Sequence, residues 1–154
     1  MRFALLMMSA AALPAVLLAH RGESPVTLIG HDRVAAAFAK GGPLIETDDY
    51  KIHASRREAP GVAEIHTRDT DIAYVIQGSA TLVTGGSAVD LKSVGPEELR
   101  GPAITGGETR KLGPGDVVVI PNGVPHWFKE VEAPFLYYVV KVRQAERSTN
   151  PGAM

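Results

Sequence analysis

The sequence predicts a single all-β domain that is preceded by one short helix. A series of short runs rich in β-branched, aromatic and aliphatic residues is separated by turns containing Gly and Pro, which is the pattern of successive strands. A chain of 154 residues that is 45% hydrophobic is long enough to bury a real core, and one domain is the default at this length. We therefore expect the folded domain to span residues 25–145, followed by a flexible polar tail over 146–154.

Residues 1–24 differ in character from the rest of the chain. A short positive end precedes an uncharged run rich in Leu, Ala and Met, Phe3–Ala19, and polar residues follow. This pattern is typical of a secretory signal peptide cleaved after Ala19, which indicates a periplasmic or secreted protein without a stable membrane span after its removal. Because Leu17 matches the cleavage pattern poorly, an uncleaved N-terminal anchor and a buried N-terminal helix stay open as alternatives.

Charge and cysteine content exclude several classes of protein. The formal net charge is −1 and no basic face is visible, so nucleic acid is not an expected partner. The chain has no cysteine, which excludes disulfides, thiolate metal ligands and a cysteine nucleophile.

The first regular elements of the predicted domain are a helix and two strands. Asp32–Lys40 follows a helical pattern, with Asp32 placed to cap its start. Strand-like runs follow at Leu44–Glu46 and Tyr50–Arg57. His53 lies in the second run, and a lone histidine in a strand is more often a surface or core residue than a ligand.

The stretch Val62–Gly78 carries the first group of candidate site residues. Alternate side chains of a strand share a face, so Glu64 and His66 point the same way. After a turn, Asp71 begins a second strand and points to the face opposite an apolar stripe. The stripe consists of Ile72, Tyr74 and Ile76.

The stretch Gly115–Glu130 carries the second group. It reads as an apolar buried strand, a turn with Pro and Gly, and a strand that opens with His126. Phe128, two residues later, should point inward with His126. Two carboxylates and two imidazoles converging from adjacent strands are the donor set of a divalent metal site.

The segments after each group are less informative. The connection between residues 85 and 115 is interrupted by Gly and Pro pairs, which are typical of turns. It is either a flap over the site or an elaborated hairpin. Within it, Pro96–Arg100 is expected to form one helical turn. The last strong strand spans residues 134–142, where one of the adjacent Tyr137 and Tyr138 must face inward.

The spacing of these residues resembles the two motifs of the cupin superfamily. His66-x4-Asp71-x6-Gly78 keeps the spacing of the first motif, and Gly115-x5-Pro121-x-Gly123-x2-His126-x3-Glu130 keeps that of the second. Three positions depart from the family pattern: Glu64 replaces a histidine, Asp71 a glutamate and Glu130 an asparagine. The resemblance implies a jelly-roll β-barrel.

The resemblance also implies a divalent metal ion held by Glu64, His66, Asp71 and His126, with Fe, Mn or Zn favoured by the mixed nitrogen and oxygen donors. Salt bridges from Glu64 or Asp71 to a nearby arginine are the alternative; the candidates are Arg56, Arg57 and Arg68. The expected function is an enzyme acting on a small organic molecule by oxygenase, isomerase or lyase chemistry. A non-catalytic module binding a small ligand, with a structural metal or none, is the alternative. The family also implies a homodimer.

Overall fold

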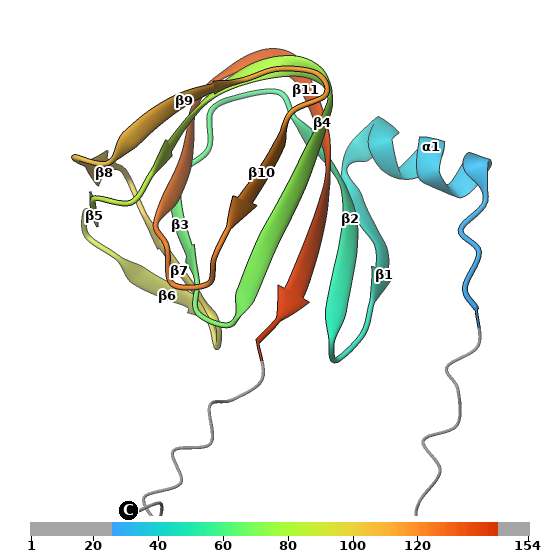
Figure 1. Cartoon of the computed structure of the whole chain (residues 1–154), viewed down its shortest axis with the longest axis horizontal. Coiled ribbons are helices and arrows are strands. Elements are labelled where there is room, and N and C mark those ends of the chain that lie inside the picture. Colours follow the sequence, from blue (N-terminus) through green and yellow to red (C-terminus); the bar gives the residue numbers. More distant parts are fainter. Residues whose placement is uncertain (1–25, 145–154) are drawn as a thin grey trace, which may run out of the picture.

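The computed structural model describes residues 26–144 and shows a curled antiparallel β-sheet with one helix at its side (Figure 1). The all-β barrel predicted from the sequence is confirmed. The predicted signal peptide over residues 1–24 and the predicted tail over 146–154 lie outside the described residues.

Helix α1 (His31–Lys40) packs beside strands β1 (Gly42–Glu46) and β2 (Tyr50–Arg57), and not on the apolar stripe. The expectation that Asp32 caps the helix is wrong, because Gly30 is the N-cap residue and Asp32 lies in the first turn. Its charge there still favours the helix, since the N-terminal turn carries partial positive charge. The Phe38 ring meets Tyr138 edge-on, with centroids 4.9 Å apart. Within residues 26–144, no helix is long and apolar enough to span a membrane.

Two long strands organise the barrel. Strand β4 (Asp69–Thr84) pairs with β11 (His126–Arg143) along nearly its whole length. Strand β11 also pairs with β2, whereas β4 pairs on its other edge with β9 (Glu108–Leu112) and β10 (Val117–Ile120). Register shifts in β11 between residues 128 and 137 bend the pair, and bulges of this kind let a sheet curl into a barrel.

Gly78, the last residue of the first motif, makes this bend possible. Its φ is +76°, in the left-handed region that favours glycine. A Cβ at this position would lie 2.5 Å from the carbonyl oxygen of Pro134 and 2.7 Å from that of Glu132. Only glycine therefore lets β4 and β11 approach so closely here.

The connection between residues 85 and 115 is an elaborated hairpin that returns to the barrel. Strands β6 (Lys92–Gly95) and β7 (Glu98–Gly101) form a hairpin, and β7 pairs with β3 (Ala63–His66). The helical turn expected at Pro96–Arg100 is wrong, because β3 offers a strand edge that residues 98–101 complete. The short strands β5 (Ser87–Ala88) and β8 (Ile104–Thr105) pair separately.

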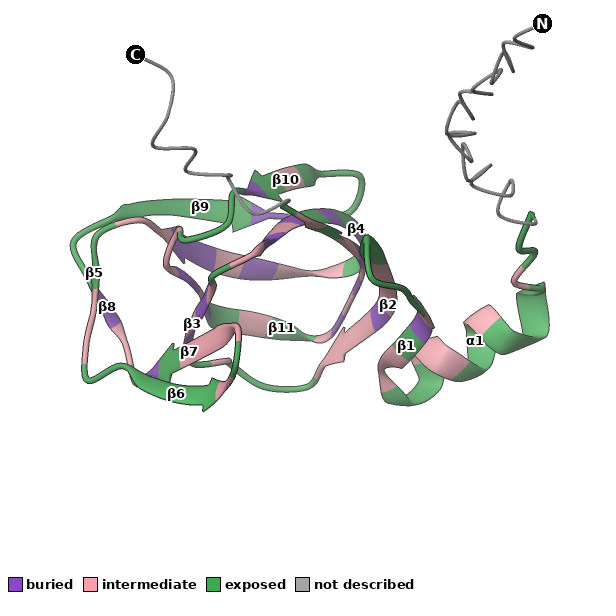
Figure 2. Ribbon diagram, turned by 90° about the horizontal axis from the view of Figure 1, so that it is seen from below, coloured by how far each residue is buried: buried purple, intermediate pink, exposed green. Residues whose placement is uncertain are grey.

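The core is formed by buried residues of β4 and β11, together with Leu112 of β9 and Ile120 of β10, and Figure 2 shows buried stretches along the long strands. Val75, Leu82 and Phe135 are its largest fully buried side chains. Phe128 and Tyr137 belong to the same cluster and also line a cavity, so the core is directly continuous with the candidate site.

Candidate metal site

A cavity of about 270 Å³ is lined by residues of β2, β3, β4, β7, β10 and β11. All four residues predicted as ligands from the sequence line it: Glu64, His66, Asp71 and His126. The inward face of each strand supplies these side chains, as the two-residue alternation requires.

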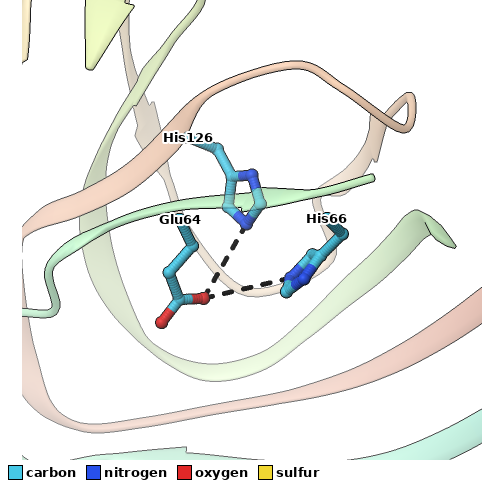
Figure 3. A group of neighbouring side chains, drawn as sticks. All are labelled: Glu64, His66 and His126. Carbon is cyan, nitrogen blue, oxygen red and sulfur yellow. Dashed lines mark ion pairs between the residues drawn. The ribbon is translucent and has the colours of Figure 1, made fainter. Parts of the chain in front are cut away.

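Three of the four predicted ligands form a compact group. The Nε2 atoms of His66 and His126 lie 4.0 Å and 3.9 Å from the same oxygen of Glu64, Oε2 (Figure 3). One donor atom from each of the three residues lies within 4.8 Å of the others. The two imidazole rings are 5.1 Å apart, centre to centre. One ion could be reached by all three side chains after small rotations.

Strand pairing explains why these residues meet. His126, the first residue of β11, stands opposite Glu64 of β3, and His66 follows Glu64 on the same face. The turn before β11 is tied to the end of β3, because the Gly123 amide donates a hydrogen bond of 2.8 Å to the His66 carbonyl. Gly123 has a φ of +80°, so the motif glycine provides a conformation that other residues adopt with strain. The second motif therefore positions both histidines.

Both histidines are held in the neutral form that binds metal. Burial, and then the positive charge of Lys141, lower the pKa of His66. Burial, and then the neighbouring His66, lower the pKa of His126. The Nδ1 atom of His126 lies 3.2 Å from the Val124 carbonyl oxygen, and a proton donated there leaves Nε2 free as a ligand.

Asp71, the fourth predicted ligand, lies outside the three-residue group. Its carboxylate accepts two hydrogen bonds from the Lys141 ammonium, at 2.8 Å and 2.7 Å. The same carboxylate lies 3.4 Å from His66 Nε2. Asp71 thus contacts a candidate ligand while its charge is matched by Lys141, and a direct bond from Asp71 to a metal stays a prediction.

Glu64 has cationic neighbours as well as imidazoles. Arg57 Nη2 and Arg100 Nε lie 4.0 Å and 3.9 Å from its two oxygens. Arg57 was one of the three arginines considered as salt-bridge partners. The other two have different partners: Arg56 pairs with Glu58 and Arg68 with Glu97.

The cavity contains several residues that the sequence did not single out as site residues. His53 lines the cavity but lies outside the three-residue group, and its Nε2 lies 2.8 Å from Glu46 Oε1. Glu98 and Arg100 enter from β7, whose pairing with β3 no local pattern revealed. Lys141 could have been predicted from the alternation of side chains along β11, because it shares the inner face of that strand with Tyr137 and Val139.

Other assignments from the sequence are confirmed. Phe128 points into the cavity, and Tyr137 is the inward member of the tyrosine pair. Glu130 is exposed and accepts a hydrogen bond of 2.6 Å from Thr81, away from the cavity.

The donor set fits a divalent ion of the iron, manganese or zinc type. Two neutral imidazoles and one carboxylate on one side of an ion leave positions for water or substrate. The group sits in a cavity that is open to solvent at its mouth, which is what an exchangeable ligand requires. A closed structural site would instead surround the ion with four protein ligands.

Comparisons with known proteins agree with this architecture. A family model described as Cupin matches residues 54–151. Among solved structures, a Bacillus halodurans protein has a TM-score of 0.55 at 15% identity and covers 82% of this chain and 87% of its own. Hydroquinone 1,2-dioxygenase from Sphingomonas sp. TTNP3, solved with 4-hydroxybenzoate bound, has a TM-score of 0.54 at 17% identity. The match covers 79% of this chain and 83% of the dioxygenase chain. Among proteins with curated descriptions, none matches the sequence. At these identities the structural neighbours show a shared fold.

Proposed function

This chain belongs to the cupin family, and we propose that it is a metal-dependent enzyme acting on a small organic molecule. The observation that carries the proposal is the convergence of Glu64, His66 and His126 on one point of a cavity, with both Nε2 atoms facing one carboxylate oxygen. An iron, manganese or zinc ion held there would supply a Lewis acid for a substrate oxygen.

The surrounding residues support a reaction at this point. Phe128, Ile120 and Val139 give the cavity apolar walls that limit water around the substrate. The ion pair between Lys141 and Asp71 fixes a charged network beside His66. The volume of about 270 Å³ limits the substrate to a small molecule. Oxygenase, isomerase and lyase chemistry all fit this description.

A non-catalytic ligand-binding cupin is the second candidate, and one observation favours it. Arg57 and Arg100 already lie about 4 Å from Glu64, so the carboxylate has opposite charge nearby without an ion. Under this alternative the cavity would hold its ligand with a structural metal or none.

Metal analysis tests whether the chain binds an exchangeable ion, as the metal-dependent proposal requires. The protein should be purified without chelators, and its metal content measured by mass spectrometry before and after dialysis against a chelator. We expect about one Fe, Mn or Zn per chain, exchangeable with the others, as for a site with open positions. A chain that takes up none of these ions when each is added in excess would contradict the metal-dependent proposal.

We also propose that the chain forms a homodimer through the outer face of β4 and β10. The stripe of Ile72, Tyr74 and Ile76 is exposed, and Val117 and Val119 extend it on the neighbouring strand. Tyr74 is 48% and Val117 is 62% accessible, so this apolar face is available to a second copy. Light scattering should give the mass of a dimer, and Tyr74→Lys should give that of a monomer. Val94→Lys, on exposed β6, is the control, and a monomeric native protein would refute the interface.

We propose in addition that the protein is exported, on the basis of the sequence of residues 1–24. Fractionation of cells expressing the full chain should place it in the periplasm or medium. The mass of the recovered protein should correspond to cleavage after Ala19. Recovery of the intact chain from the membrane fraction would instead support an uncleaved anchor.

A further inference from the structure

The basic side chains around His66 differ in how their charges are matched. Five of them line the cavity or the adjoining one of about 490 Å³, which shares His53, His66, Glu98 and Lys141 with it. Four of these five make a close ion pair with a carboxylate: Lys51 with Asp69, Arg100 with Glu98, Lys141 with Asp71, and Arg143 with Glu97. The fifth is Arg57, whose nearest carboxylate among the described residues, that of Glu64, lies 4.0 Å away.

The Arg57 guanidinium is held in place by two neighbouring side chains, which leave most of its N–H donors available to a ligand. Its Nε donates a hydrogen bond of 3.0 Å to the Tyr137 hydroxyl, and its Cζ lies 4.7 Å from the centre of the Phe128 ring. Among residues 26–144, Tyr137 is its only hydrogen-bond acceptor. The side chain is 22% accessible, and its terminal N–H groups are not among the buried atoms without a hydrogen-bond partner, so they remain reachable from the cavity. An arginine has five N–H donors, so the hydrogen bond from Nε to Tyr137 leaves the donors on Nη1 and Nη2 available to a ligand.

Two neighbours adapt to this arrangement. A Cβ at Gly61 would lie 2.7 Å from Arg57 Nη1, so the glycine leaves room for the guanidinium. The Tyr137 oxygen accepts a hydrogen bond from Arg57 Nε–H, so the Tyr137 hydroxyl can donate a hydrogen bond of its own into the cavity. Arg57 and Tyr137 together offer hydrogen-bond donors to a ligand in the cavity that both residues line.

We infer that the substrate is a small carboxylate, and that Arg57, assisted by Tyr137, binds its carboxylate group. A planar guanidinium fork matches a carboxylate in a bidentate pair. Because Arg57 lies 4.0 Å from Glu64, a carboxylate bound to it leaves an oxygen on the adjacent carbon close to Glu64, His66 and His126. The substrate class is therefore a small acid with a keto, enol or hydroxyl oxygen next to its carboxylate. This inference rests on the proposed function for the role of that oxygen.

Pyruvate and pyruvamide test the inference, since they share a shape and differ in charge. NMR titrations of the folded metal-free protein and of the zinc-loaded protein measure both dissociation constants and the shift of the Arg57 Nε–H signal. We expect pyruvate to bind about 10- to 100-fold more tightly than pyruvamide in both forms, as a charge-assisted hydrogen-bonded pair predicts. Arg57→Gln should abolish this preference, and Arg57→Lys should retain part of it.

A control and a second variant separate binding from folding. Arg56→Gln removes a neighbouring charge from the same strand, where Arg56 pairs with Glu58, and should leave the preference unchanged. Gly61→Ala displaces the guanidinium without removing charge and should also reduce the preference. Equal affinities for the two probes in the native protein, or an unchanged preference in Arg57→Gln, would overturn the inference.

A failure of the carboxylate inference can be distinguished from a failure of the proposed metal-dependent function. A chain that binds one metal ion but shows no preference for pyruvate refutes the carboxylate site alone. A chain that binds no metal, yet prefers pyruvate in an Arg57-dependent way, supports the carboxylate site and refutes the metal-dependent enzyme.

Discussion

Replacing His66 by alanine is the most direct perturbation of the candidate metal site. The imidazole Nε2 lies 4.0 Å from Glu64 Oε2, and its loss removes one of the three donors in the group. His66 is preferable to His126 as the first target, because His126 is 3% exposed and its truncation would also leave a buried cavity. The strands on both sides of His66 pair through their backbones, so the barrel should stay folded.

The size of the effect follows from the number of ligands. Structural zinc sites with four ligands bind zinc with a free energy of about 10–16 kcal/mol, or about 2.5–4 kcal/mol per ligand. Loss of His66 should therefore weaken the affinity for zinc by about 60- to 800-fold. Isothermal titration calorimetry of the metal-free protein with zinc and with manganese measures this change, and circular dichroism checks the fold.

His53→Ala is the matched control. His53 lines the same cavity, but its Nε2 pairs with Glu46 and it does not belong to the three-residue group. Its removal should leave the affinity and stoichiometry unchanged. Equal metal affinity in the native protein and in His66→Ala would refute the assignment. A loss in His53→Ala as large as that in His66→Ala would place the ion elsewhere in the cavity.

Three further predictions concern charge, protonation and backbone. Glu64→Gln should weaken metal binding by about tenfold or more, about 1.4 kcal/mol, because the amide is an uncharged donor. Glu64→His should keep metal binding and shift the preference toward copper and nickel. Unchanged affinity in Glu64→Gln would point to Asp71 as the carboxylate ligand. The pKa values of His66 and His126 are lowered, so protons compete with metal only below the ordinary pKa range of histidine. The affinity for metal, measured by calorimetry, should therefore be constant from about pH 8 to about pH 6.5 and fall at lower pH. The stability of the metal-free protein should decrease over the same acidic range, because the unfolded chain binds protons there that the folded chain does not, and denaturant unfolding that is independent of pH would contradict this. Gly78→Ala should lower the free energy of unfolding in urea by about 2–5 kcal/mol, because backbone strain adds to the clash with Pro134. Gly85 has a φ of +72° and no neighbour within 4 Å, so Gly85→Ala should cost only the strain of about 1–2 kcal/mol.

The parts of the fold that were predictable are those set by local pattern. The strand Tyr50–Arg57 begins and ends where its run of residues indicated. The convergence of Glu64, His66 and His126 followed from alternation within strands and from the spacing of the two motifs. These features depend on neighbours along the chain, which the sequence displays directly.

The parts that were not predictable depend on strand register and on pairing across long separations. The bond from Lys141 to Asp71 joins residues 70 positions apart, and it forms because β4 and β11 pair in a register set by bulges near residues 128–137. The same applies to β7, where the free edge of β3 overrides the local preference for a helical turn. The helix start differs by one residue from the expected one, which is ordinary for element ends.

The charges of the cavity connect the proposed function with the inferred substrate. Three basic and three acidic side chains line it, and they balance: Arg57, Arg100 and Lys141 against Glu64, Asp71 and Glu98. The lowered pKa values of His66 and His126 keep both imidazoles out of this balance. A divalent ion added to a balanced cavity leaves an excess of positive charge, which is costly in a partly buried site. An anionic substrate offsets that excess, and Arg57 is the cationic group in the cavity that has no close carboxylate partner. Metal binding and carboxylate binding should therefore reinforce each other, since each supplies the charge that the other lacks.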